Sequence, residues 1–160
     1  MPITPRKMNI SSGLEGSVTA LVNSLLLAVD QRNYEYVRQC LADTVHFDTV
    51  SLGGTARNIT AEEMITGLQS TFQNLSGTQH LIAAQLVTTD DDGTITSVGQ
   101  YQAYHYRDDL PERRLWVHGG RHIYRLRHNG QLLKVEGLRV EMAWMWGDPA
   151  VISTPSPTQG

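Results

Sequence analysis

Four of the six histidines are the side chains best suited to chemistry: His80, His105, His118 and His122. Each lies in a β-rich stretch of the kind that forms a strand with one buried face. Histidine exchanges a proton near neutral pH, and an apolar setting tunes that exchange. We therefore expect general acid–base chemistry in an apolar pocket. The alternative for His80 is a core histidine that bonds to a backbone carbonyl.

Alternation along a strand indicates which way each histidine points. In segment 114–128, Arg121, Arg125 and Arg127 share one face, which should be in water. His118 and His122 lie on the other face and should therefore point to the interior. His105 is in phase with Tyr101, and residues 138–144 offer one further apolar face. The residues predicted to face inward are His80, Tyr101, His105, His118, His122, Tyr124, Leu138 and Met142. On the same strand faces as these residues lie Ile82, Ala84, Leu86, Val140 and Trp144. Gln85 and Thr89 are predicted to face outward.

A histidine base needs a carboxylate that holds its tautomer and stabilises its charged form. Asp30 is the candidate, because it directly follows Val29 at the end of an apolar helical face. A carboxylate at that position borders the core, and the helix dipole disfavours it there. Position alone leaves open the alternative that Asp30 is a surface loop residue.

Three helices are expected to come first in the chain. Apolar residues at helical spacing predict a helix over 14–29, and Asn33 can cap a short helix over 34–41. Thr60 and Glu63 form a capping-box pattern for a third helix, which should end near Phe72. The β-rich stretch 45–51 lies between the second and third helices.

Strands are expected after Gly77. Segments 80–89 and 94–107 flank a turn at 90–93, and segments 114–128 and 131–146 flank the turn pair Asn129-Gly130. Helices followed by a long antiparallel meander predict an α+β fold. The N-terminal helices should pack in the concave face of a curved mixed or antiparallel sheet, giving a cone-shaped barrel with an internal pocket.

Length and composition indicate one globular domain of 160 residues, with 40% apolar and 18% charged residues. Residues 1–12 and 149–160 are predicted to be flexible tails around a domain at 13–148. A net charge of −3 argues against nucleic acid as a partner. The single cysteine, Cys40, excludes an internal disulfide. We expect no membrane partner and a cytoplasmic location.

Several motifs, in this order, resemble the SnoaL-like superfamily with the nuclear-transport-factor-two fold, and within it scytalone dehydratase and its relatives. They are the segment Asp30–Tyr34, the strand start Thr78–Ile82, a second histidine one hairpin later at His105, and Trp146-Gly147-Asp148. The resemblance spans about residues 14–148.

The resemblance implies an Asp–His pair in a closed hydrophobic pocket, with no metal and no organic cofactor. Scytalone dehydratase removes water from a β-hydroxy ketone. By this resemblance, Asp30 orients His80, His80 removes a proton next to a carbonyl group, and His105 is a hydrogen-bonding or proton-donating partner. The substrate would be a small hydrophobic carbonyl compound of polyketide, terpenoid or steroid type. Oligomers are common in the superfamily, so a homo-oligomer, a dimer or trimer, is expected.

The chain departs from scytalone dehydratase where that enzyme has two tyrosines that hold a water over the substrate. Those positions correspond to Val29 and Thr49, and Tyr34 or Tyr124 is a candidate replacement. The substrate is therefore not identified as scytalone. The expected substrate-binding residues are Tyr34, Thr49, Tyr101, His118, His122, Tyr124, Leu138 and Met142.

Other functions stay open at this point. The same fold hosts non-catalytic ligand-binding or assembly modules and polyketide cyclases. Epoxide hydrolysis is disfavoured because no arginine is placed inward. A metal site is disfavoured as well: His118 and His122 would lie roughly 13 Å apart along a strand, and His105 and His118, which can approach across a hairpin, have no evident acidic third ligand.

Overall fold

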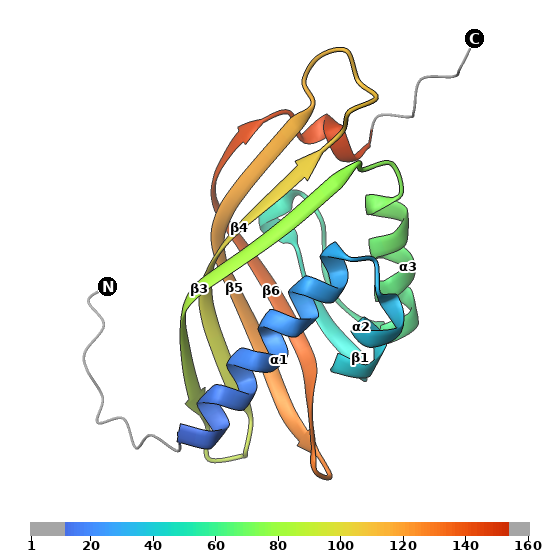
Figure 1. The fold of residues 1–160 in the computed structure, drawn as a ribbon. Coiled ribbons are helices and arrows are strands. Elements are labelled where there is room, and N and C mark those ends of the chain that lie inside the picture. Colours follow the sequence, from blue (N-terminus) through green and yellow to red (C-terminus); the bar gives the residue numbers. More distant parts are fainter. Residues whose placement is uncertain (1–11, 154–160) are drawn as a thin grey trace.

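A computed structural model describes residues 12–153, which fold into three α-helices on a six-stranded sheet (Figure 1). The helices are α1 (Ser12–Asp30), α2 (Tyr34–Cys40) and α3 (Ala61–Phe72). The strands are β1 (Leu41–Asp48), β2 (Ala56–Thr60), β3 (Gly77–Thr89), β4 (Ile95–Tyr106), β5 (Leu115–Asn129) and β6 (Leu132–Gly147). Two 3-10 helices, η1 (Val50–Leu52) and η2 (Pro149–Ile152), follow β1 and β6. The predicted α+β fold is confirmed.

The sheet has the strand order β2-β1-β6-β5-β4-β3. Neighbouring strands run antiparallel except β1 and β6, which are parallel. The predicted turns join β3 to β4 and β5 to β6, with Gly93 and Gly130 at positive φ. Because β4, β5 and β6 are consecutive neighbours, the strands that carry three of the four histidines form the centre of the sheet.

Helices α2 and α3 begin where their capping residues predict. The Asn33 side chain accepts a hydrogen bond from the Tyr36 amide at the start of α2. Thr60 and Glu63 form the complete capping box of α3. A cap of this kind stabilises a helix by about 1 kcal/mol. The turn between α1 and α2 is tight, and Arg32 adopts a positive φ of 59° there.

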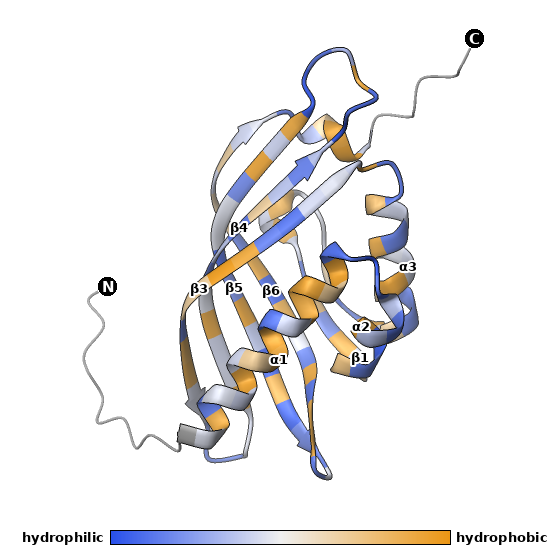
Figure 2. Cartoon of the chain, viewed as in Figure 1, coloured by the Kyte–Doolittle hydropathy of each residue, from blue (hydrophilic) through white to orange (hydrophobic). Residues whose placement is uncertain are grey.

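The core lies between the helices and the concave side of the sheet. α1 buries one face, including Val18, Val22 and Leu25, and packs against β3. Figure 2 shows apolar and hydrophilic residues interspersed along α1 and along the strands behind it. Residues 13–30 have the length and mean hydropathy of a membrane span, a test that the core helices of globular domains also pass. Cys40 is buried in the same core, as expected for a small apolar residue.

Strand β3 contradicts the simple alternation that the sequence predicts. The register of β3 and β4 shifts between residues 83 and 86, and Ala84 adopts a positive φ of 51°. Beyond this bulge the faces exchange. Leu86 is exposed, whereas Gln85 bonds to Asn23 of α1 and to Ser97 of β4. The prediction is correct for His80 and Ile82 and wrong for Ala84, Gln85 and Leu86, because a bulge adds one residue to the strand.

A second register shift lies in β6. Gly119 pairs with Trp144 and Gly120 pairs with Met142, so Ala143 is the extra residue. Trp144 then packs over Gly119, where an added Cβ would meet the indole ring, and the ring is 44% exposed. The predicted common inward face of Val140 and Trp144 therefore ends at this bulge.

The folded part continues past the predicted boundary at residue 148. Asp148 caps η2 by accepting from the Ala150 amide, and Val151 is buried. Strand β2 was not predicted, because only Ile59 of its five residues is buried. The rest of the two predicted tails, residues 1–11 and 154–160, lies outside the described residues.

Candidate active site

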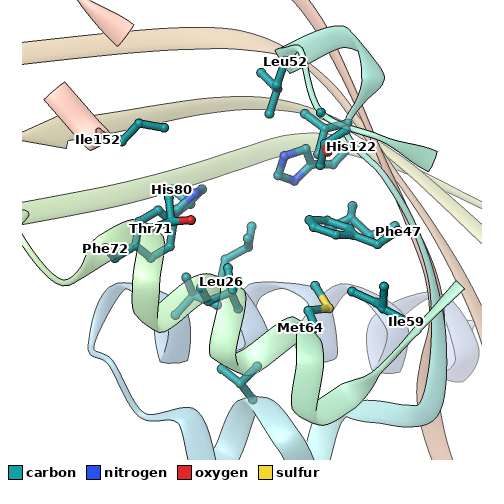
Figure 3. Close-up of a pocket in the computed structure, with 18 of the residues that line it drawn as sticks. Leu26, Phe47, Leu52, Ile59, Met64, Thr71, Phe72, His80, His122 and Ile152 are labelled. Carbon is teal, nitrogen blue, oxygen red and sulfur yellow. The ribbon is translucent and has the colours of Figure 1, made fainter. Parts of the chain in front are cut away.

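A cavity of about 510 Å³ lies between the helices and the sheet (Figure 3). Its walls are mostly apolar and come from α1, α2, α3, β1 and β6, with four histidines on the side of β3, β4 and β5. The apolar lining includes Leu25, Leu26, Val29, Phe47, Met64, Leu68, Phe72, Leu138 and Ile152. A cavity of this size and composition is typical of a site for a small organic molecule.

Asp30 and His80 are joined at the end of α1. The carboxylate accepts one hydrogen bond from the His80 backbone amide at 2.8 Å and another from His80 Nδ1 at 2.6 Å. Both side chains are largely buried, with 14% and 11% exposed. The pairing confirms the predicted inward orientation of His80 and excludes a surface-loop role for Asp30.

The tautomer of His80 follows from this pairing. An ionised carboxylate only accepts hydrogen bonds, so Nδ1 carries the hydrogen and Nε2 carries a lone pair. Figure 3 shows the His80 ring directed into the cavity. A lone pair at that position can accept a proton from a bound molecule.

Arg32 and Phe72 surround this pair. The Arg32 guanidinium donates to the backbone oxygens of Val29 and Asp30 and lies 5.2 Å from the Phe72 ring centroid. Phe72 contacts His80 with ring centroids 6.1 Å apart. These contacts fix the last turn of α1 and therefore the position of the carboxylate.

His105 and His118 form a hydrogen-bonded pair deeper in the wall. Their Nε2 atoms lie 3.2 Å apart. Thr78 Oγ1 bonds to Nδ1 of His105 at 3.1 Å, and the Tyr101 hydroxyl bonds to Nδ1 of His118 at 2.9 Å. All four ring nitrogens of the pair are therefore engaged by protein groups.

His122 lies on β5 in register with Gly99, two rows beyond His118 on the same face. Its ring stacks on Tyr101 with centroids 3.9 Å apart, and Nδ1 lies 3.1 Å from the Tyr124 hydroxyl. Figure 3 shows this ring on the opposite side of the cavity from His80.

Burial keeps three of the histidines neutral. Burial, with a smaller contribution from the neighbouring His80, lowers the pKa of His105 to about 3, that of His118 to about 4 and that of His122 to about 3. Burial also raises the pKa values of Tyr101 and Tyr124. The cavity wall beside His80 therefore consists of uncharged hydrogen-bonding groups at neutral pH.

The structure places most of the predicted site residues on the cavity. Those that line it are His80, His105, His118, His122, Tyr124, Thr49 and Leu138. Tyr34 packs against the core, Tyr101 lies behind His118 and His122, and the Met142 amide donates to Ser51 Oγ. Tyr34, Tyr101 and Met142 do not line the cavity, so the structure gives no support to direct substrate contact by these three.

Sequence reasoning missed the contribution of α3. Met64, Leu68 and Phe72 line the cavity at spacings of four residues along this helix, and Gly67 lies between them. That spacing was a readable signal for an apolar helical face. Trp116 also lines the cavity, and its buried Nε1 has no hydrogen-bond partner in the described part of the chain.

Within residues 12–153, no group of three or more His, Cys, Asp and Glu side chains is arranged to hold a metal ion.

Solved structures with the same fold include several proteins of low sequence identity. The Kfla4162 protein of Kribbella flavida has a TM-score of 0.79 at 15% identity, covering 86% of this chain and 95% of that one. A scytalone dehydratase-like protein of Novosphingobium aromaticivorans has a TM-score of 0.73 at 9% identity, covering 84% and 87%. The hexachlorocyclohexane dehydrochlorinase LinA-type3 of Novosphingobium barchaimii has a TM-score of 0.69 at 11% identity, covering 90% and 96%. At these identities the likeness establishes the fold.

The family of the chain is identified from its sequence. No curated protein matches the chain significantly. The family model of the SnoaL-like domain matches residues 14–139, which is most of the chain. The matched part includes Asp30 and the four cavity histidines, His80, His105, His118 and His122. The resemblance inferred from the short motifs is thereby confirmed, and the chain belongs to the SnoaL-like domain family.

Proposed function

We propose that this protein is a cofactor-independent enzyme, either a lyase of the dehydratase type or an isomerase, that acts on a small apolar carbonyl compound. The observation that carries the proposal is the 2.6 Å bond between Asp30 and His80 Nδ1 beside an apolar cavity. A binding module has no need of a buried carboxylate that fixes the tautomer of a cavity-facing imidazole. A buried carboxylate paired with an imidazole beside a cleft is typical of a functional site.

In the proposed reaction His80 Nε2 removes a proton from the carbon next to the carbonyl group. The C–H electron pair forms a carbon–carbon double bond, and the carbonyl oxygen becomes an enolate. Asp30 stabilises the imidazolium that results. The enolate then expels the β-hydroxyl group, which takes the proton from His80 and leaves as water, so that the protein returns to its starting state. Without a leaving group, return of the proton to another carbon gives isomerisation.

The cavity supports an apolar substrate of a few fused rings or an equivalent chain, of polyketide, terpenoid or steroid type. Its lining is apolar away from the histidines, so binding would come mainly from burial of hydrocarbon. The apolar walls would also limit the access of water to the enolate. Two of the structural neighbours, the scytalone dehydratase-like protein and the dehydrochlorinase, have names that denote elimination reactions.

His105 takes a supporting role in this proposal. Its nitrogens are engaged by Thr78 and His118, and its low pKa keeps it uncharged. It would line the substrate site as a neutral ring held by protein groups, and it would not deliver a proton as an imidazolium.

The proposal is tested by turnover of bicyclic β-hydroxy ketones, for example 3-hydroxy-1-tetralone, whose dehydration gives 1-naphthol. Replacement of His80 by alanine should abolish turnover, and added imidazole should restore part of it. His128→Ala is the matched control, because His128 is an exposed histidine at the far end of β5. A non-catalytic binding module would be favoured if the wild type binds the ketones without turnover above background and His80→Ala gives the same result as the wild type.

A further inference from the structure

We propose that His122 is a second catalytic residue, whose Nε2–H donates a hydrogen bond to the carbonyl oxygen of the substrate opposite the His80 base. The inference rests on the proposed function and names the group that would hold the developing enolate. It also assigns Tyr124 as the positioning residue that selects the tautomer of His122.

The Tyr124 hydroxyl group sets the hydrogen-bonding role of His122 Nδ1. This side chain is fully buried, and its only hydrogen-bond partner within residues 12–153 is Nδ1 of His122. A buried hydroxyl hydrogen without an acceptor costs free energy, so the hydroxyl donates to Nδ1. Burial raises the pKa of Tyr124, and the phenol therefore keeps this hydrogen.

The other nitrogen of His122, Nε2, then carries the ring hydrogen. Because Nδ1 accepts, the ring hydrogen of the neutral imidazole is on Nε2. In the described part of the chain Nε2 has no protein partner, and the ring lines the cavity. Tyr101 stacks on the ring and Tyr124 contacts its edge at a centroid distance of 5.7 Å, which holds it in place. The result is a donor held in place on the cavity wall.

The other three histidines of the cavity offer no free donor. Both nitrogens of His105 and of His118 are engaged within the wall, so neither ring offers a free donor. His80 presents a lone pair, because Asp30 holds its hydrogen on Nδ1. Burial lowers the pKa of His122 to about 3, which keeps the ring a neutral donor that does not compete with His80 for the substrate proton. A fixed donor at the oxygen where charge develops is a large contribution to such reactions.

The tautomer is tested directly by NMR of the protein labelled with ¹⁵N-histidine at neutral pH, with the His122 signals assigned from His122→Phe. The inference requires the Nε2–H tautomer for His122 in the wild type. In Tyr124→Phe, which removes only the hydroxyl group, the Nδ1–H form should gain population. A wild-type His122 in the Nδ1–H form would overturn the inference, whatever the behaviour of the Tyr124 variant.

The donor role is tested by the binding of two probes that share a bicyclic skeleton, 1-tetralone and the hydrocarbon tetralin. The wild type should bind the ketone about fivefold more tightly than the hydrocarbon, the effect of one hydrogen bond. His122→Phe should lose this preference, and His46→Phe, at an exposed histidine bonded to Asn58, should keep it. An unchanged preference in His122→Phe, or failure of the wild type to bind either probe, would overturn the inference.

These measurements separate the two claims. Neither requires proton transfer by His80, so His80→Ala should retain the ketone preference while losing turnover. A ketone preference that depends on His122, in a protein without turnover, would leave this inference standing and remove the proposed function.

Discussion

His80 and His122 share a cavity but are bonded to different partners, and the partners give them opposite roles. A carboxylate accepts from Nδ1 of His80, whereas a phenol donates to Nδ1 of His122. The first histidine therefore presents a lone pair, and we infer that the second presents a hydrogen. The pairing of Asp30 with His80 could be predicted from the sequence, because a helix end and a strand start carry recognisable motifs. The pairing of His122 with Tyr124 could not, because it depends on ring rotamers within one strand.

Asp30→Asn tests the carboxylate at this scale. The amide can accept from only one of the two donors of residue 80 and directs its own NH₂ at the other, so the ring loses its tautomer control. Turnover should fall by about 10³-fold or more, while circular dichroism stays native. The control is Asp43→Asn, at an exposed carboxylate that pairs with Arg38. Activity of Asp30→Asn within tenfold of the wild type would show that the carboxylate is not part of the machinery.

At the scale of elements, the helices and hairpins follow from local signals, and the irregular strand positions do not. The caps at Asn33 and Thr60 and the turns at Gly93 and Gly130 lie where the sequence places them. The bulge at Ala84 has no local signal, because alanine gives no reason for a positive φ. Next to it, Gln85 bonds to Asn23 of α1 and to Ser97 of β4, and these tertiary contacts are not visible in the local sequence. For the same reason the inward face of β3 could be predicted only near His80.

Helix α3 carries a glycine that its own stability does not require. Gly67 lies in the middle of the helix on the cavity wall, and a Cβ added there would meet nothing within 4 Å. Gly67→Ala should therefore raise the free energy of unfolding by about 1 kcal/mol, since alanine is the better helix former. Urea denaturation measures this, with Thr60→Ala as a matched variant that should lower it by about 1 kcal/mol through loss of the cap. A less stable Gly67→Ala protein would show that the cavity is narrower than described.

At the scale of the whole molecule, the fold class follows from element order, and the cavity follows from a sheet that closes over the helices. The overall α+β architecture was therefore predictable. The C-terminal limit of the folded part was harder to predict. The buried Val151 of η2 lies in a segment of proline and small residues, a composition typical of a flexible tail. The expectation of a homo-oligomer stays a prediction, which light scattering on the purified protein would test.

The buried neutral histidines make a prediction about stability and pH. Burial lowers the folded-state pKa values of His105, His118 and His122 from 6.5 to about 3, 4 and 3. Below pH 6.5 the unfolded chain binds protons that the folded one does not. Stability should therefore be complete above pH 6.5 and should fall with decreasing pH, by about 1.4 kcal/mol per pH unit for each histidine.

Urea denaturation between pH 7.5 and pH 4.5 measures this slope. His122→Phe should reduce the slope of unfolding free energy against pH by the contribution of one histidine. His128→Phe, at an exposed position, should leave this slope unchanged. A wild-type stability that is flat across this range would contradict the burial of neutral histidines around the cavity.

The central claim is that His80 removes a proton next to a carbonyl group, and it can be measured without knowledge of the natural substrate. The measurement is the exchange of the α-hydrogens of 1-tetralone in D₂O at neutral pH, followed by ¹H NMR. We expect the protein to accelerate exchange well above buffer, and His80→Ala and Asp30→Asn to return it to the buffer rate. Exchange at the buffer rate with the wild-type protein saturated by the ketone would contradict the claim.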